Sequence, residues 1–221
     1  MVAAFGTWGG WAALTAIGTV GAVVVAIGLQ GWLSWSQRRR RPSLTLAFDS
    51  HMKVDETNPP SGARLPFLRL AVSNAKGKEA AADVEVLVVN VQEISVGPVG
   101  GGGRYVWLAN PALSWTHHTQ VVGGNLLPST RMSIPSGATR YLDVGCWLPP
   151  IPLKLTLSVF PIPGSKRHEL VAGTWRLELD VTLQNGDVTR WYAQVGFAEK
   201  VVAGLAQPVD VTGTVTPAGD R

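Results

Sequence analysis

Apolar residues predominate in the first 37 positions of the chain, and no charged side chain occurs among them. The segment 11–29, WAALTAIGTVGAVVVAIGL, has no polar face at helical spacing, whereas a helix packed on a globular core needs one. About 20 apolar residues span a bilayer as a helix. The pattern predicts an N-terminal tail and one transmembrane helix within residues 1–37, with the span at about 11–33.

Tryptophans bracket this apolar run and a block of arginines follows it. Indole rings favour the membrane–water boundary, and Lys and Arg stay on the cytoplasmic side of the membrane. We therefore expect a single-pass protein of the inner (plasma) membrane, with the N-terminus outside and the C-terminal domain cytoplasmic. Anionic lipid headgroups are the partner expected at the arginines. The residues expected at the membrane interface are Trp8, Trp11, Trp32, Trp35, Arg38, Arg39, Arg40 and Arg41.

Small residues recur at four-residue spacing in the same segment, at Gly18, Ala22 and Ala26. Such a pattern lets two helix backbones approach closely in lipid, so these three residues are candidates for a helix–helix contact. Glycine and alanine are also common in single spans that do not associate. Self-association and a lone helix are both left open.

From Ser43 onward the apolar positions alternate with a period of two, as in β-strands. Short runs such as FLRLAVSN, TRYLDV and TWRLELDVTL are separated by Gly, Pro, Asn and Ser. Asn185-Gly186 lies between two such runs and predicts a type I′ turn joining strands near 174–184 and 188–197. No segment supplies crossover helices, so the strands should form an antiparallel β-sandwich.

The domain boundaries follow from these patterns. A basic juxtamembrane linker is expected at 38–43, the β-sandwich at 44–205 and a disordered tail at 206–221. A final edge strand near Val209–Val215 is the alternative for the tail. The predicted fold class is thus mainly β, with one N-terminal transmembrane helix before the sandwich.

Two segments resemble bacterial immunoglobulin-like modules. Residues 67–88, FLRLAVSNAKGKEAAADVEVLV, show an apolar strand ending in Asn, a turn with Gly, and a strand of Val alternating with acids. Residues 134–145, IPSGATRYLDVG, show a Pro-x-Gly turn before a further strand. The resemblance implies an immunoglobulin-like sandwich and transfers no catalytic residue, because one fold hosts many functions.

The charge of the chain narrows the classes of partner. Apart from the four arginines at 38–41, 15 Lys and Arg face 15 Asp and Glu, so the region after them is neutral. A nucleic-acid-binding domain would carry its own basic surface, which makes nucleic acid an unlikely partner. The lone Cys146 lies in an apolar run and is expected to be a small buried residue.

Motifs that carry catalysis or bind metal are not found. His117 and His118 are neighbours, would point to opposite faces of a strand and have no acidic residue nearby. His168-Glu169 begins like a His-Glu-x-x-His zinc motif, but position 172 is Ala. The run of four glycines at 100–103 lacks the Lys-Ser/Thr of a phosphate-binding loop. We expect no enzyme, no cofactor and no metal.

Two functional hypotheses follow. In the first, the β-domain is a non-catalytic module that binds or scaffolds a partner protein at the cytoplasmic face, with Arg104, Trp115 and His117 as candidate contact residues. In the second, the β-domain senses a small ligand and controls assembly of the helix, with Arg104 and Trp115 lining the site. The tryptophan is chosen because it falls in a turn-rich segment, where a large aromatic can reach a partner.

Overall fold

The computed structural model describes residues 8–49, 52–57, 64–94, 105–106, 109–122, 125–148, 152–163, 168–202 and 204–219, with the backbone alone for residues 8–21, 105–106, 120–122 and 126. The chain divides into two compact units, Met1–Arg41 and Pro42–Arg221. The first unit holds the helix and the second holds all the strands.

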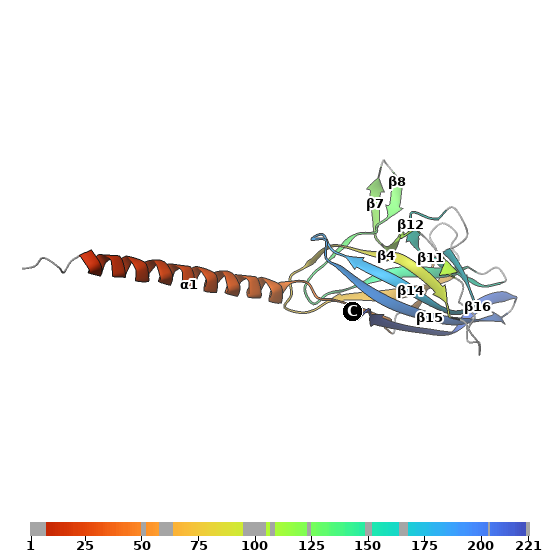
Figure 1. The fold of residues 1–221 in the computed structure, drawn as a ribbon. Helices are drawn as coiled ribbons and strands as arrows, with labels where there is room; N and C mark the ends of the chain where they lie inside the picture. The colour runs from red at the N-terminus through yellow and green to blue at the C-terminus, as the bar shows by residue number, and fades with distance from the viewer. Residues whose placement is uncertain are drawn as a thin grey trace, which may run out of the picture. The chain divides into compact units, whose positions relative to one another are not determined.

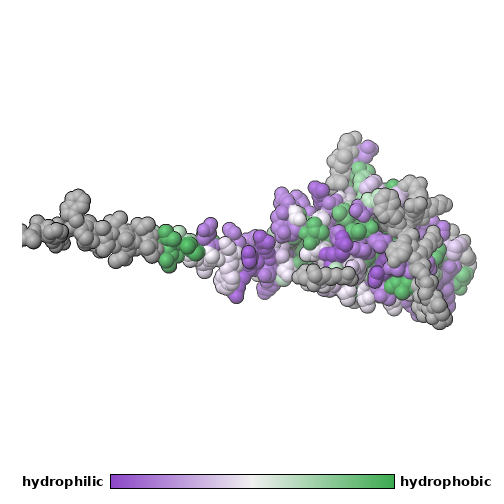
Figure 2. Space-filling view, viewed as in Figure 1, coloured by the Kyte–Doolittle hydropathy of each residue, from purple (hydrophilic) through white to green (hydrophobic). Residues whose placement is uncertain are grey.

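Helix α1 spans Trp8–Arg40, so Arg38, Arg39 and Arg40 form its last turn rather than a linker (Figure 1). Cations in the last turn complement the negative end of the helix dipole. Pro42 follows directly and cannot continue the hydrogen-bond ladder, which explains the end of the helix. The described side chains change from hydrophobic to hydrophilic toward this end (Figure 2).

In the part of the chain that the structure describes, no helix is both long enough and apolar enough to cross a membrane. The side chains of α1 are described from Ala22 onward, and that part ends in three arginines. It does not supply the roughly 20 apolar residues that a span requires. The predicted single-pass transmembrane helix is therefore wrong. The inner-membrane localisation and the orientation with a cytoplasmic C-terminal domain were both inferred from that span. These two predictions are therefore wrong as well.

The second unit is built from strands (Figure 1). Their bounds are β1 Leu44–Ala47, β2 Lys53–Thr57, β3 Arg64–Asn74, β4 Ala81–Glu93, β5 Tyr105–Val106, β6 Ala112–Trp115, β7 Thr119–Val122, β8 Asn125–Pro128, β9 Met132–Ile134, β10 Thr139–Leu148, β11 Lys154–Leu157, β12 Val159–Phe160, β13 Glu169–Val171, β14 Gly173–Thr182, β15 Val188–Val202 and β16 Leu205–Pro217.

The described strands form one large sheet and a separate β7–β8 hairpin. The main path of the large sheet is β1-β3-β10-β6-β4-β14-β15-β16, and the pairings are antiparallel. A sandwich needs two separate sheets, but β6 pairs with both β10 and β4 and makes the path continuous. The strands form a nearly closed, barrel-like sheet, so the predicted immunoglobulin-like β-sandwich is wrong.

The two ends of the path meet through a close contact. A Cβ atom added to Gly213 of β16 would lie 2.5 Å from Cδ2 of Phe48, the residue after β1. Real Cβ atoms do not approach a ring carbon so closely, so the absence of a side chain at Gly213 makes room for the aromatic ring. Phe48 also packs against the core. The contact explains how strands from opposite ends of the sequence come together.

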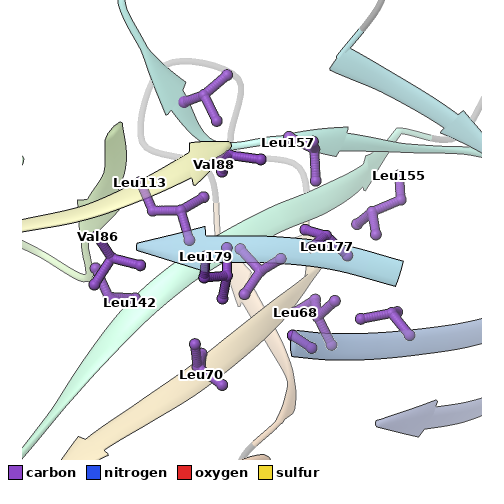
Figure 3. Close-up of a cluster of buried hydrophobic side chains, with 14 of the residues drawn as sticks. Leu68, Leu70, Val86, Val88, Leu113, Leu142, Leu155, Leu157, Leu177 and Leu179 are labelled. Atoms are coloured by element: carbon purple, nitrogen blue, oxygen red, sulfur yellow. The ribbon is translucent and has the colours of Figure 1, made fainter. Parts of the chain in front are cut away.

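The core fills the interior of the sheet (Figure 3). Leu68 and Leu70 of β3 and Leu177 and Leu179 of β14 are at most 1% exposed. Their spacing of two places them on the inner face of each strand, as the alternation in the sequence predicts. Three tryptophans are among the largest fully buried side chains: Trp115, Trp147 and Trp175.

The β14–β15 hairpin confirms the strand pairing predicted around Asn185-Gly186. Its turn differs from the predicted type I′, because only Gly186 of this described pair has a positive φ, at 81°. The Gly186 N–H donates to Leu183 O, and the Leu183 N–H donates to Asp187 O. This is a three-residue loop with a glycine bulge. At the end of the chain, β16 takes the place of the expected disordered tail and agrees with the alternative of an edge strand.

Candidate functional site

Of the three residues that the sequence suggested for partner binding, the structure describes two, and these two differ in exposure. Trp115 lies in β6, is 2% exposed and donates its Nε1–H to Thr130 O at 3.2 Å. His117 lies in the following turn with φ 58°, and 71% of its side chain is exposed. Arg104 lies outside the described residues. Trp115 is thus a core residue that offers a partner almost no surface.

The residues predicted for the membrane interface and the helix–helix contact lie in α1, apart from Arg41, which follows it. Trp8, Trp11 and Gly18 are helical, and only their backbone is described. Ala22 and Ala26 are exposed. Trp32 and Trp35 are more than half exposed, and the Arg39 guanidinium lies 3.9 Å from the centre of the Trp35 ring. That stacking is a local contact within α1.

A cavity of about 500 Å³ lies at one end of the barrel-like sheet. The first residues of β3, the last of β10 and the first of β16 meet there, together with β2. Its walls are mainly apolar, and Lys53, Asp55, Arg64 and Gln207 add polar groups. The apolar lining residues are Leu65, Pro66, Trp147, Leu153, Leu205, Ala206 and Pro208.

Trp147 lines this cavity, but its polar atom does not face it. Its side chain is 1% exposed, and its ring packs edge-on against Phe197 with 5.7 Å between ring centres. The indole Nε1 is buried and has no hydrogen-bond partner in the described structure. An atom that faced a cavity of this size would be accessible to water, and this nitrogen is not. Trp147 therefore contributes apolar ring surface to the cavity.

The charged residues of the cavity come from β2 and β3. The Lys53 ammonium donates to Pro208 O at 3.2 Å and so joins β2 to β16. An ammonium has three donors, so two remain for another acceptor. Arg64 is exposed at the start of β3, and Asp55 is exposed on β2. Two cations against one carboxylate leave an excess of one positive charge at the cavity.

A buried ion-pair network supports β2 on its other face. Arg69 of β3 has a side chain only 8% exposed, and it pairs with Glu56 of β2 at 2.7 Å and with Asp143 of β10 at 2.9 Å. The Thr116 hydroxyl donates to the same Asp143 oxygen at 2.8 Å. The hydrogen bond from Arg69 lowers the pKa of Glu56 below its usual range. Glu56 is therefore ionised at neutral pH.

Successive side chains of β2 point to opposite faces of the strand. One short strand therefore contributes to the cavity and also to the ion-pair network. Lys53 and Asp55 line the cavity, while Glu56 points to the opposite side and contacts Arg69. His117 Nε2 lies 3.2 Å from the second Glu56 oxygen. The cavity wall is thereby fixed by the strand ladder with β3 and by side-chain contacts at both faces.

Groups suited to catalysis or metal binding are not gathered in the described structure. In that part of the chain, no three His, Cys, Asp or Glu residues are placed to hold one metal ion. Burial raises the pKa of the Cys146 thiol, so this thiol stays protonated at neutral pH and is a weak nucleophile. The chemistry that the cavity offers is noncovalent: apolar contact, two cations and one carboxylate.

The cavity was not predicted from the sequence. KVDET at 53–57 was not predicted as a strand, yet it forms one, and its two faces have separate roles. Trp147 was not among the candidate site residues. The alternation within 53–57 could have indicated the strand, but only the pairing with β3 brings it beside Trp147.

No protein-family model matches the chain, and neither a curated protein nor a solved structure was found to resemble it. The fold and the cavity together define the class as a mainly β protein with a barrel-like sheet and an amphipathic cavity at one end. Its function must be argued from that geometry.

Proposed function

We propose that the second unit is a non-catalytic binding module that takes a small, largely apolar ligand in the cavity at the end of the sheet. The observation that carries this proposal is the cavity itself, about 500 Å³ in volume with apolar walls. Sites for small molecules commonly measure about 300–1,000 Å³ and occur in the mouths of β-barrels. Their lining is mainly apolar, with a few polar groups that set orientation.

This proposal develops the small-ligand hypothesis and moves the site. Arg104 and Trp115 were expected to line it, but Trp115 is buried in the core. The partner-protein hypothesis named the same tryptophan as one of three candidate contacts, with Arg104 and His117. A cavity with mainly apolar walls is a more specific feature than an exposed loop, and it favours a small ligand.

Binding of a neutral apolar dye to the full chain tests this function. Nile red should bind in the cavity and fluoresce, because burial of apolar surface favours transfer from water. Leu205 lines the cavity and is 57% exposed, so Leu205→Asp should leave the core intact. A carboxylate in the apolar wall should weaken dye binding by about 10-fold.

Val188→Asp is the matched control, because Val188 is also 57% exposed and does not line this cavity. It should leave dye affinity unchanged. Absence of dye binding to the unaltered chain, or equal weakening by both variants, would contradict the proposed function.

A further inference from the structure

Cations predominate among the charged groups of the cavity. Lys53 and Arg64 carry hydrogen-bond donors and no acceptor. Of the groups that line the cavity, Asp55 and the Gln207 amide offer acceptor oxygens on side chains. A ligand that brings acceptors and negative charge complements this set better than one that brings donors.

Lys53 and Arg64 also have donor positions that no described protein acceptor occupies. Lys53 uses one hydrogen bond on Pro208 O. In the part of the chain that the structure describes, no hydrogen bond or ion pair involves the Arg64 side chain. A carboxylate has two oxygens with about four acceptor positions, and it can meet a guanidinium with two parallel hydrogen bonds.

We propose that the ligand of this cavity is an apolar carboxylate. This inference rests on the proposed function, and it names the ligand class. The hydrocarbon or aromatic body of the ligand packs against Leu153, Leu205 and the Trp147 ring. Its carboxylate meets the Lys53 ammonium and the Arg64 guanidinium. No bond is made or broken, so the site works by recognition alone.

A competition series on the full chain tests the ligand class. Decanoate, decanol and decylamine share one alkyl body and differ in the head group, and each is titrated against bound Nile red below its micelle concentration. Decanoate should displace the dye at a concentration about 10-fold lower than decanol, because charge-assisted hydrogen bonds are roughly twice as strong as neutral ones. Decylamine should be the weakest. Naphthoate and naphthol, run in parallel, tell a flat aromatic body from an alkyl chain.

Single substitutions test which residues produce the preference for decanoate over decanol. Lys53→Met and Arg64→Met should each reduce the decanoate-to-decanol preference by at least about 3-fold, because each removes a charged donor. Arg140→Met is the control, since Arg140 is exposed on β10 and does not line the cavity. Trp147→Phe should weaken acid and alcohol alike, because both lose the same apolar contact with the larger indole ring.

The outcomes separate the two proposals. If Nile red binds but the acid, alcohol and amine displace it equally, the ligand class is overturned while the proposed function stands. A preference for decylamine also overturns it. If neither dye nor any competitor binds, the proposed function itself fails. Loss of the acid preference in Lys53→Met and Arg64→Met, with Arg140→Met unchanged, supports the assignment.

Discussion

At the scale of single residues, Arg69 in the described sheet carries a charge on a buried side chain. Its side chain is 8% exposed and is neutralised by Glu56 and Asp143. Replacing it by Met leaves both carboxylates near the core without a counter-charge. We expect Arg69→Met to lower the free energy of unfolding by about 3 kcal/mol, measured by urea denaturation.

The exposed Arg140 again provides the comparison. Arg140→Met should change the free energy of unfolding by less than about 0.5 kcal/mol. Equal effects of the two substitutions would mean that the network contributes nothing beyond the general effect of losing an arginine.

The same network predicts how stability depends on pH. The Arg69 hydrogen bond lowers the pKa of Glu56 below its ordinary value of 4.5. A carboxyl with a lowered folded pKa contributes stability that is fully present above the unfolded pKa and is lost as pH falls through the folded pKa. Glu56→Gln should therefore destabilise the protein at about pH 7 and cost less at about pH 3 in urea denaturation. A cost independent of pH would exclude this role.

The residue scale was also the hardest to predict from sequence. Trp115 lies between turn-forming residues and suggested an exposed loop, but Leu142 of β10 pairs with it and the core closes over it. Glu56 and Arg69 are 13 positions apart, and nothing in the alternation indicates that they meet. Side-chain partners depend on strand pairing, which a local pattern does not contain.

At the scale of elements, the contact between β16 and the end of β1 closes the sheet. Gly213→Ala would place a Cβ 2.5 Å from Phe48 Cδ2. Overpacking of this kind costs about 1–3 kcal/mol, so the urea midpoint should fall. In a Phe48→Ala background, the same substitution should cost less because the ring is gone.

Gly219→Ala serves as the control for this prediction. An added Cβ there has nothing within 4 Å, so its effect on the midpoint should be small. If Gly213→Ala costs as much without the Phe48 ring as with it, the two residues do not act together in closing the sheet.

Element identity was largely predictable, because alternation and turn residues are local signals. The β14–β15 hairpin was placed correctly from the pattern around Asn185-Gly186. The turn type was not, since Asn185 keeps a negative φ and the loop gains a residue. The helix was also recognised as a helix, while the membrane span inferred from it is not supported by the described residues.

At the scale of the whole molecule, the same strands could have formed a sandwich or a barrel-like sheet. Alternation fixes which face of a strand is buried, and both architectures bury one face. The difference lies in a few long-range pairings, above all those of β6 with β10 and β4. Pairings of this kind have no local signature, so the fold class beyond "mainly β" could not follow from the pattern. The cavity depends on the same pairings and was missed for the same reason.

The core also predicts which part of the chain folds independently. Every residue of the core cluster that the structure describes lies between Leu46 and Ala206, within the unit Pro42–Arg221. A chain of residues 42–221 should therefore unfold in urea with the same midpoint and slope as the full chain. The slope reports the surface exposed on unfolding, so it tests whether the core is complete. Removing residues 205–221 instead deletes β16, including buried Ala206 and the Gly213 contact with Phe48, and should lower the midpoint. A lower midpoint on loss of residues 1–41, as large as that on loss of β16, would show that the helix contributes to the stability of the β-unit.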